Sequence, residues 1–480
     1  MPLNLPQVLK LIHEANGNEV WQCFGIEEAL NNIQFATINP FVIENNGINY
    51  LLTSDKDDNN IAAFDYVLLT SKRPKRHDVN TNHINIKRWL KHPSFVDRTA
   101  DQVVASWKDR FNFIKEDEVA NVKGLRPPQI GALYSILAHI QNPEDKAIVV
   151  MPTGTGKTET MLATLIANQC KKILVSVPSD SLRTQISRKF ISLGLLKEFG
   201  IVAAECMNPI VGILNSGFET PQDLQEFILK CNVVISTMDL LTDCSNAEQI
   251  ILKDTFSHFF VDEAHHSEAK TWKELIGRFS KEKVFLFTAT PFRNDGKNLQ
   301  GKVIFNFSLR KAQEQKYYKE IKLLPIREYN KKIADKKIAD KAVEQLKADI
   351  AAGYNHFLMA RCKDKTRAKE VFEHYQAYPE HNPIMVHTGV GGLSKKIEAI
   401  KNGEHAIIVC VNMLGEGFDL PNLKIAAIHD ERQSLPITLQ FIGRFTRSSY
   451  DVLGNASFIA NIAYPPIHDE LDQLYARNAD

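Results

Sequence analysis

The stretch Met151-Pro-Thr-Gly-Thr-Gly-Lys-Thr158 has the residue types of a loop that binds a chain of phosphates. It follows the apolar run Ile148 to Val150, and sequence with a helical period comes after it. Gly154 and Gly156 permit a tight turn in which backbone N–H groups point inward. The following helix would present its positive N-terminal end to the same phosphates.

Two side chains of this loop predict a nucleoside triphosphate with a bound magnesium ion. Lys157 can reach the β- and γ-phosphates, and the Thr158 hydroxyl can hold Mg²⁺. The strict pattern has a glycine at the place of Met151, so the prediction depends on the strand before the loop and the helix after it. The alternative is a glycine-rich turn with a structural role only.

A second candidate is the acidic pair in Phe259-Phe-Val-Asp-Glu-Ala-His-His266. The pair ends an apolar run, at the edge where α/β sheets bind their ligands. Asp262 would hold the Mg²⁺ through water, and Glu263 would orient or deprotonate an attacking water. The alternatives are a solvated acidic turn and a metal site at the adjacent His265 and His266, for which no third ligand is evident.

A third candidate is the basic stretch Gln440-Phe-Ile-Gly-Arg-Phe-Thr-Arg447. A phosphoryl transition state spreads negative charge over the γ-oxygens, and an arginine that reaches it from another lobe is worth roughly 10³- to 10⁵-fold in rate. Arg444 and Arg447 are three positions apart, so both would lie on one face of a helix. The alternative is a basic helix on the surface.

The elements that would position these groups appear as two series of short apolar runs. Runs rich in β-branched and aromatic residues are typical of strands buried on both faces of a parallel sheet. Helical stretches such as 159–169 and 182–193 would form the crossovers. The runs are 148–150, 173–177, 233–235, 259–261 and 284–287 in the first series, and 357–359, 384–386, 406–411, 425–428 and 458–462 in the second.

The composition is that of a globular protein with several domains. A length of 480 residues suggests roughly three domains. The hydrophobic share of 44% and the charged share of 24% exclude a mostly disordered or fibrous chain. The 58 lysines and arginines are balanced by 57 acidic residues, so the chain has no overall basic charge. A surface for nucleic acid would therefore have to be a local patch.

The sequence also indicates a compartment. Seven cysteines without a C-x-x-C pair argue against a disulfide scaffold and against a cysteine zinc site. The first twenty residues lack a basic start followed by an apolar core, and no apolar run reaches about 18 residues. We therefore expect neither a signal peptide nor a membrane span, and we predict a cytoplasmic protein.

Three regions lie outside these motifs. Residues 1 to about 115 mix a helix-like stretch at 8–12 with strand-like ones, and their basic cluster at 72–76 is either a solvated loop or a phosphate contact. The charged stretch 308–350, with its doublet KKIADKKIAD, is interpreted as a linker plus an exposed helix. Because the chain stops inside helix-like sequence, we expect a fragment of a longer protein.

Taken in order, these stretches resemble the motifs of superfamily-two helicases, in the DEAH-signature branch that includes restriction-enzyme motor subunits and excision-repair helicases. MPTGTGKT resembles motif I, VDEAHH motif II and QFIGRFTR motif VI. The resemblance covers about residues 120–465. The other matching segments are LRPPQIGAL (125–133) before the phosphate loop, VPSDSLRTQ (177–185) as motif Ia, FTATP (287–291) as motif III, HFLMARCKDKTRAKEVF (356–372) as motif IV and VNMLGEGFDLP (411–421) as motif V.

The resemblance implies an α/β fold with two RecA-like parallel-sheet lobes in tandem, ATP between them, and a mixed α/β N-terminal domain. The implied domains are an N-terminal accessory domain at 1–118, lobe one at 119–307, a linker at 308–335, and a truncated lobe two at 336–480. No nuclease signature is visible in the first 115 residues.

The resemblance also implies roles for further residues. Arg126 and Gln129 would lie near the adenine, and Thr288 and Thr290 would couple the ATP site to the nucleic-acid site. The second lobe would contribute Gly415, Gly417 and Asp419 at the ribose or the bound strand, and Gln440 at the γ-phosphate or its water. The implied sets are Lys157, Glu263, Gln440, Arg444 and Arg447 for catalysis, Thr158 and Asp262 for the metal, and Arg126, Gln129, Thr153, Gly154, Thr155, Gly156, Lys157, Thr158, Gly417 and Asp419 for ATP.

The predicted function is therefore an ATP-dependent helicase or translocase, acting on DNA rather than RNA, with Mg²⁺ as the cofactor. Arg183 and Thr237 are candidates for phosphate contacts to the strand, and ordinary loop polarity is their alternative. Anti-phage defence with a nuclease or other partner is one biological setting, and DNA repair is another. The rival reading is an ATP-gated clamp or signalling scaffold that does not separate strands.

Overall fold

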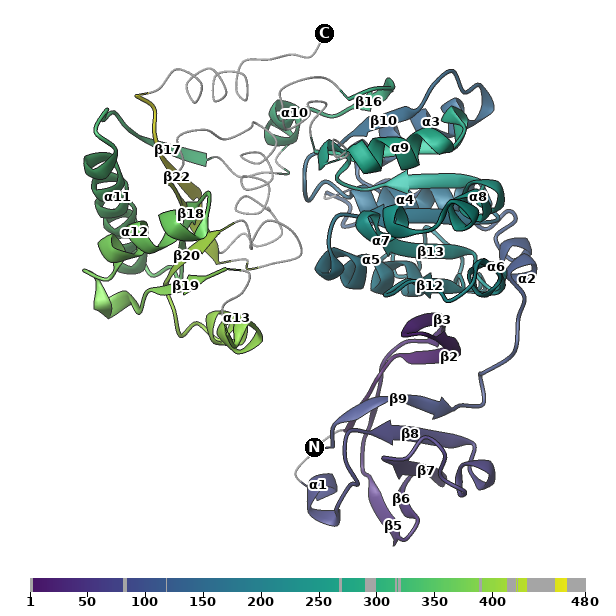
Figure 1. The fold of residues 1–480 in the computed structure, drawn as a ribbon. Helices are drawn as coiled ribbons and strands as arrows, with labels where there is room; N and C mark the ends of the chain where they lie inside the picture. Colours follow the sequence, from purple (N-terminus) through teal and green to yellow (C-terminus); the bar gives the residue numbers. More distant parts are fainter. Residues whose placement is uncertain are drawn as a thin grey trace. The chain divides into compact units, whose positions relative to one another are not determined.

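The computed structural model describes residues 3–80, 84–117, 119–266, 270–289, 299–315, 317, 321–387, 391–411, 420, 422–429 and 454–463. In these ranges the strands form four sheets (Figure 1). The chain divides into two compact units, one of residues 1–125, 161–177 and 183–260, the other of residues 126–160, 178–182 and 261–480.

The N-terminal region consists mostly of strands. A mixed sheet has the order β5-β6-β7-β8-β9, in which β7 and β8 are parallel and the other pairs antiparallel. The elements are β1 (Leu3–Leu5), β2 (Val8–Ala15), β3 (Asn18–Gly25), β4 (Glu28–Leu30), β5 (Gln34–Ile38), β6 (Phe41–Asn45), β7 (Ile48–Thr53), β8 (Tyr66–Thr70) and β9 (Ile86–Lys91), with the short helices η1 (Ile61–Ala63), α1 (Arg76–Asn80) and α2 (Ala100–Ala105).

The helix expected at residues 8–12 was wrong, because this stretch belongs to strand β2. Asn16 and Gly17 have φ values of 50° and 73°, the left-handed conformations of a tight hairpin turn, and β3 returns antiparallel to β2. An Asn-Gly pair between apolar stretches is a strong hairpin signal. The same pair at Asn46 and Gly47 connects β6 to β7.

The first lobe is built on a sheet of the order β16-β10-β15-β14-β11-β13-β12-β3-β2. The five apolar runs of the first predicted series all lie in its strands, which confirms them as strands. The strands are β10 (Ala147–Val150), β11 (Ile173–Val177), β12 (Val211–Ile213), β13 (Val233–Thr237), β14 (His258–Val261), β15 (Val284–Thr288) and β16 (Lys302–Asn306). The helices are α3 (Pro127–Gln141), α4 (Lys157–Ala167), α5 (Asp180–Ser192), α6 (Pro221–Leu229), α7 (Met238–Asp243), α8 (Asn246–Thr255) and α9 (Lys270–Arg278), with η2 (Ala264–His266) and η3 (Lys281–Lys283).

The hairpin β2–β3 extends this sheet, although it lies in the range predicted as the accessory domain. Strand β3 pairs antiparallel with β12, with Val20 opposite Gly212. Buried Asn18 accepts hydrogen bonds at Oδ1 from the backbone N–H groups of Asn215 (2.7 Å) and Ser216 (3.0 Å). The N-terminal segment therefore covers an edge of the first-lobe sheet that would otherwise offer unpaired backbone groups.

The second lobe is a parallel sheet of the order β17-β22-β21-β18-β20-β19. Strand β17 pairs with β22 although it lies in the range predicted as linker, so the second sheet includes residues before position 336. The strands are β17 (Ile321–Ile326), β18 (Phe357–Cys362), β19 (Ile384–Val386), β20 (Ile407–Val411), β21 (Leu423–Ile428) and β22 (Ala456–Asn461). The helices are α10 (Leu309–Glu314), α11 (Lys331–Ala351), α12 (Lys365–Tyr375) and α13 (Leu393–Lys401), with η4 (Pro379–His381).

The charged stretch after residue 330 forms the helix that we expected, but one face of it is buried. Ile338, Ala342 and Leu346 on α11 recur every four positions and belong to the second-lobe core. The first-lobe sheet, which is parallel at β10–β15, β10–β16, β11–β13 and β12–β13, and the parallel second-lobe sheet confirm, with their helices, the predicted α/β fold class. In the described ranges no helix is both long and apolar enough to cross a membrane.

Candidate nucleotide-binding site

The loop between β10 and α4 has the backbone that the sequence predicted. Gly154 and Gly156 have φ values of 89° and 100°, in the left-handed region where a side chain is strained. A Cβ atom on Gly156 would lie 1.9 Å from Nε2 of Gln129. Glycine is therefore required at position 156 for two reasons, the turn of the chain and the side chain that lies against it.

The start of α3 lies against this loop. The backbone N–H of Arg126 donates to Oε1 of Gln129 at 2.7 Å, and the Arg126 guanidinium donates to the Gly154 carbonyl at 3.3 Å. Gln129 is buried. The structure thus brings the two residues that the resemblance placed near the adenine onto the phosphate loop.

Met151 has a structural role in place of the glycine of the strict pattern. Its backbone N–H donates to the Thr288 carbonyl at 2.9 Å, and its buried side chain accepts the Thr160 hydroxyl at 3.7 Å. The turn begins only after it, where the Thr155 hydroxyl donates to the Pro152 carbonyl at 2.7 Å. Because Met151 continues the line of β10, this position does not need a glycine.

The first two predicted chemical groups meet in a buried salt bridge. Nζ of Lys157 lies 2.6 Å from Oε1 of Glu263 and 3.9 Å from Oδ1 of Asp262. All three side chains are less than a tenth exposed. Removal of one partner of such a buried pair is strongly destabilising, because the other charge stays buried without compensation. The ammonium group therefore lies in a site that can bind an anion.

The backbone at the acidic pair is unusual. Glu263 has a φ of 48°, a left-handed conformation that a residue with a side chain rarely adopts. Its N–H donates to Oδ1 of Asp262 at 3.0 Å. Residues held in such conformations cluster at functional sites, where the surrounding structure maintains them.

His265 is a residue whose place in this site the sequence did not show. Its ring is fully buried, with Nδ1 3.3 Å from the Thr288 hydroxyl and 3.5 Å from Oε2 of Glu263. It therefore connects the acidic pair to the end of β15, where the coupling residue Thr288 was predicted. The sequence analysis included it in the motif II match and weighed it as a metal ligand with His266, but did not connect it to Thr288. The described residues contain no cluster of three or more His, Cys, Asp or Glu side chains suited to a metal ion.

Arg183 and Thr237, the candidates for contacts to a nucleic-acid strand, both follow the carboxyl edge of the first-lobe sheet. Strands β11 and β13 are parallel, with Val177 opposite Thr237. Arg183 lies in the first turns of α5, which follows β11. Thr237 caps α7, because its hydroxyl accepts the N–H of Leu240 at 3.4 Å. That contact gives Thr237 a structural role as well.

The basic cluster is accessible in the structure. Lys72, Arg73, Lys75 and Arg76 are all exposed, and the Arg76 guanidinium lies 5.2 Å from the centre of the Phe35 ring.

Seven predicted residues lie outside the described ones. They are Thr290, Gly415, Gly417, Asp419, Gln440, Arg444 and Arg447.

Comparisons with known proteins agree with this geometry. Residues 123–293 match the family model of the type III restriction enzyme, res subunit. The chain is also 22% identical over 471 residues to a protein assigned as helicase 22 of Sulfolobus islandicus filamentous virus (isolate Iceland/Hveragerdi), with 85% of this chain and 81% of that protein covered.

Solved structures with a similar fold include two nucleic-acid complexes. The ATP-dependent type ISP restriction-modification enzyme LlaBIII bound to DNA is 17% identical, with a TM-score of 0.47 and coverage of 88% of this chain and 34% of that one. The Mycobacterium smegmatis helicase Lhr bound to ssDNA and AMP-PNP is 14% identical, with a TM-score of 0.47 and coverage of 72% and 47%.

The family match spans the phosphate loop, the acidic pair and the strand that ends at Thr288, so it includes every contact of the site. The predicted enzyme class, a nucleic-acid-dependent ATPase, agrees with it. Residues 123–293 are thus similar to a restriction-enzyme motor subunit, and the chain as a whole is similar to a helicase, which agrees with the resemblance to superfamily-two helicases that the order of its motifs predicted.

Proposed function

We propose that the protein is an ATP-driven motor that moves along DNA. The observation that carries this proposal is the buried contact of Lys157 with Glu263 beside the phosphate loop. In this proposal the Lys157 ammonium would serve as the cation for the phosphates, and the Glu263 carboxylate beside it would act on the attacking water. ATP would bind through Arg126, Gln129 and the loop from Thr153 to Thr158.

The contact suggests how ATP would change the site. The γ-phosphate would take the place of the Glu263 carboxylate at Lys157, because the triphosphate carries more negative charge. Glu263 would then be released to orient water and accept its proton. The Thr158 hydroxyl and the Asp262 carboxylate supply oxygen donors of the kind that Mg²⁺ prefers. The ion would neutralise charge on the phosphates.

The second lobe would complete the site. Gln440, Arg444 and Arg447 would act on the γ-phosphate, and Gly417 and Asp419 on the ribose or strand, as the motif order implies. Hydrolysis would then require the lobes to close, and a cycle of closing and opening would move one grip on the strand past the other. Grips on phosphates rather than on base edges make such a motor tolerant of sequence.

The choice of DNA rests on the match to a restriction-enzyme subunit. A nuclease as partner and a role in anti-phage defence follow the same analogy, and DNA repair is the alternative setting. In this proposal most of residues 1–118 form an accessory domain that lends the hairpin β2–β3 to the first-lobe sheet, and the second lobe begins with β17, inside the range 308–335 predicted as linker. A clamp that binds ATP without separating strands is the rival function.

The test is an ATPase assay with single-stranded DNA, double-stranded DNA and RNA side by side, together with a strand-displacement assay. We expect DNA to stimulate hydrolysis more than RNA. Stimulation without displacement or movement would favour the clamp. Absence of any stimulated hydrolysis would remove the proposed function.

The variant Lys157→Ala checks the site itself. We expect loss of ATP hydrolysis by at least about a hundredfold, because the phosphates lose their cation in the ground state and in the transition state. The same change leaves Glu263 without its 2.6 Å partner, so a thermal unfolding curve must show that the protein is still folded. Full turnover in a folded variant would contradict the assignment.

A further inference from the structure

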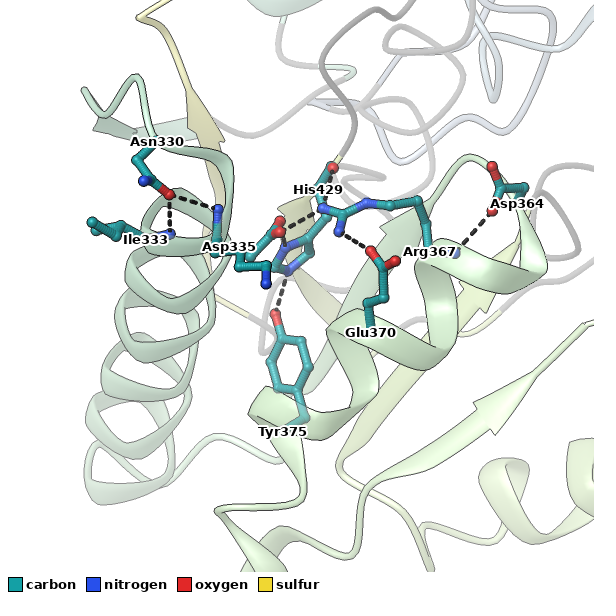
Figure 2. A network of polar contacts seen from close by, with 9 residues as sticks. Asn330, Ile333, Asp335, Asp364, Arg367, Glu370, Tyr375 and His429 are labelled. Atoms are coloured by element: carbon teal, nitrogen blue, oxygen red, sulfur yellow. Dashed lines mark hydrogen bonds and ion pairs between the residues drawn. The ribbon is translucent and has the colours of Figure 1, made fainter.

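A buried polar cluster lies at the carboxyl end of β21 in the second lobe (Figure 2). Its members are Asp335 on α11, Arg367 and Tyr375 on α12, and His429, which directly follows β21. We call these four residues the His429 cluster. Each is less than a tenth exposed, so three elements enclose the cluster.

All four hydrogen-bonding groups of His429 have partners. Its backbone N–H donates to the Arg361 carbonyl on β18 at 3.1 Å, and its carbonyl accepts from Nη2 of Arg367 at 3.4 Å. The ring contacts Oδ1 of Asp335 through Nδ1 at 3.0 Å and the Tyr375 hydroxyl through Nε2 at 3.0 Å. The backbone and the ring of this one residue are thus held by β18, α11 and α12.

The charges of the cluster favour one arrangement. Burial raises the pKa of Asp335, but hydrogen bonds from His429 and Arg367 outweigh burial and lower it, so the carboxylate stays ionised. Burial lowers the pKa of His429, so its ring stays neutral. A neutral ring donates at Nδ1 to the carboxylate and accepts at Nε2 from Tyr375. The orientation of the ring is therefore determined.

Arg367 fixes the backbone at this point. Nη2 of Arg367 lies 2.5 Å from Oδ2 of Asp335 and also reaches the His429 carbonyl, while Nη1 lies 2.6 Å from Oε2 of Glu370. Its own backbone N–H is capped by Asp364 at 2.8 Å. A planar guanidinium with several fixed partners restricts direction as well as distance.

The position of His429 at the end of β21 indicates that the cluster has a role besides stability. The carboxyl edge of a parallel sheet is where such folds bind ligands. In the sequence, His429 lies 15 positions before Arg444. Apolar residues of similar volume are often as stabilising as a buried ion pair, so stability alone does not require these charges.

We propose that the His429 cluster is a positioning device: it fixes the end of β21 at the edge where the second lobe would complete the ATP site, and so determines the rate of ATP turnover. This inference rests on the proposed function, in which the second lobe completes that site.

The same lobe contains a matched control. His356 and Asp349 also form a pair, in which the histidine is buried and Asp349 is partly buried, with Nδ1 2.7 Å from Oδ2. His356 precedes β18, so this pair lies at the amino edge of the parallel sheet, opposite to the His429 cluster. A variant of each pair removes the same charge from the same lobe, at opposite edges.

The experiment compares Asp335→Asn with Asp349→Asn in the full chain, measuring kcat and the KM for ATP at saturating DNA, with thermal unfolding of both. We expect Asp335→Asn to lower kcat about ten- to a hundredfold, the scale of effect that misplacement of a reacting group produces. We expect its KM for ATP to stay within about twofold, because the phosphate loop is unchanged. Asp349→Asn should change kcat less than about twofold.

Two results would overturn the inference. One is an equal fall of kcat in the two variants, which would indicate a loss of stability only. The other is a KM for ATP that rises as much as kcat falls. If Asp335→Asn does not fold, Arg367→Lys replaces it, since it keeps the charge but not the planar fork, and the same outcomes apply. Absence of turnover in the unaltered protein would instead refute the proposed function.

Discussion

The contact between Lys157 and Glu263 at 2.6 Å has a consequence for ATP affinity. In the proposed function the ammonium group has an ionic partner before the nucleotide binds, so ATP would have to displace that partner. A competing charge pair of this kind weakens binding, because the free protein is stabilised and the complex is not.

Glu263→Gln tests this competition. We expect ATP to bind more tightly to the variant, because a neutral amide holds Lys157 less strongly than a carboxylate does. We also expect hydrolysis to fall by at least about a hundredfold, since the amide cannot accept a proton from water. Equilibrium binding of labelled ATP and single-turnover hydrolysis measure the two effects separately. Weaker ATP binding would argue against the competition.

At the scale of elements, the strands of both lobes could be predicted because their physics is local. A buried parallel strand must be apolar on both faces, and 173–177, which is buried at every position, has the same bounds in the structure as in the sequence. The turn at Gly154 and Gly156 is equally local. These features need no knowledge of the rest of the chain.

Other elements could not be predicted, because distant partners determine them. The pairing of β3 with β12 depends on residues far apart in the sequence, and no pattern within residues 8–25 indicates it. The cluster around His429 likewise joins Asp335, Arg367 and Tyr375 from separate elements. The phosphate loop and the acidic pair were predicted, but their direct contact was not.

The hairpin β2–β3 leads to a testable prediction at the scale of elements. Asn18→Ala removes the Oδ1 acceptor of two backbone N–H groups, those of Asn215 and Ser216. We expect a loss of about 2 kcal/mol in the free energy of unfolding, because each of the two part-buried hydrogen bonds contributes about 0.5–1.5 kcal/mol. Denaturant unfolding measures it. Asn49→Ala on the exposed face of β7 is the control and should change stability by less than about 0.5 kcal/mol. Equal effects would contradict the role of Asn18.

At the scale of the whole molecule, the stability of the protein should depend on pH. Burial lowers the pKa of five histidines below the usual value of 6.5, so the unfolded chain takes up protons first as the pH falls. Stability contributed by these groups is complete above about pH 6.5 and is lost below it. The five are His13, His92, His139, His381 and His429.

Buried thiols set the upper limit of the same window. Burial raises the pKa of Cys170 and Cys231 to about 12, from an ordinary value of 9.0. Above about pH 9 the unfolded thiols release protons that the folded ones keep, and stability falls again. We expect the unfolding temperature to be highest between about pH 7 and pH 9. A flat profile from pH 5.5 to pH 7.5 would contradict the burial of the histidines.

The pairing of residue 20 with residue 212 also has a consequence for synthesis. The hairpin β2–β3 leaves the ribosome long before its partner strand exists, and at about 5–20 residues per second that interval is on the order of ten to forty seconds. During this time β3 has no partner strand, because β12 has not yet been synthesised. The first lobe therefore cannot complete its sheet as the chain emerges, and an early stop before β12 would leave an open strand edge prone to aggregation.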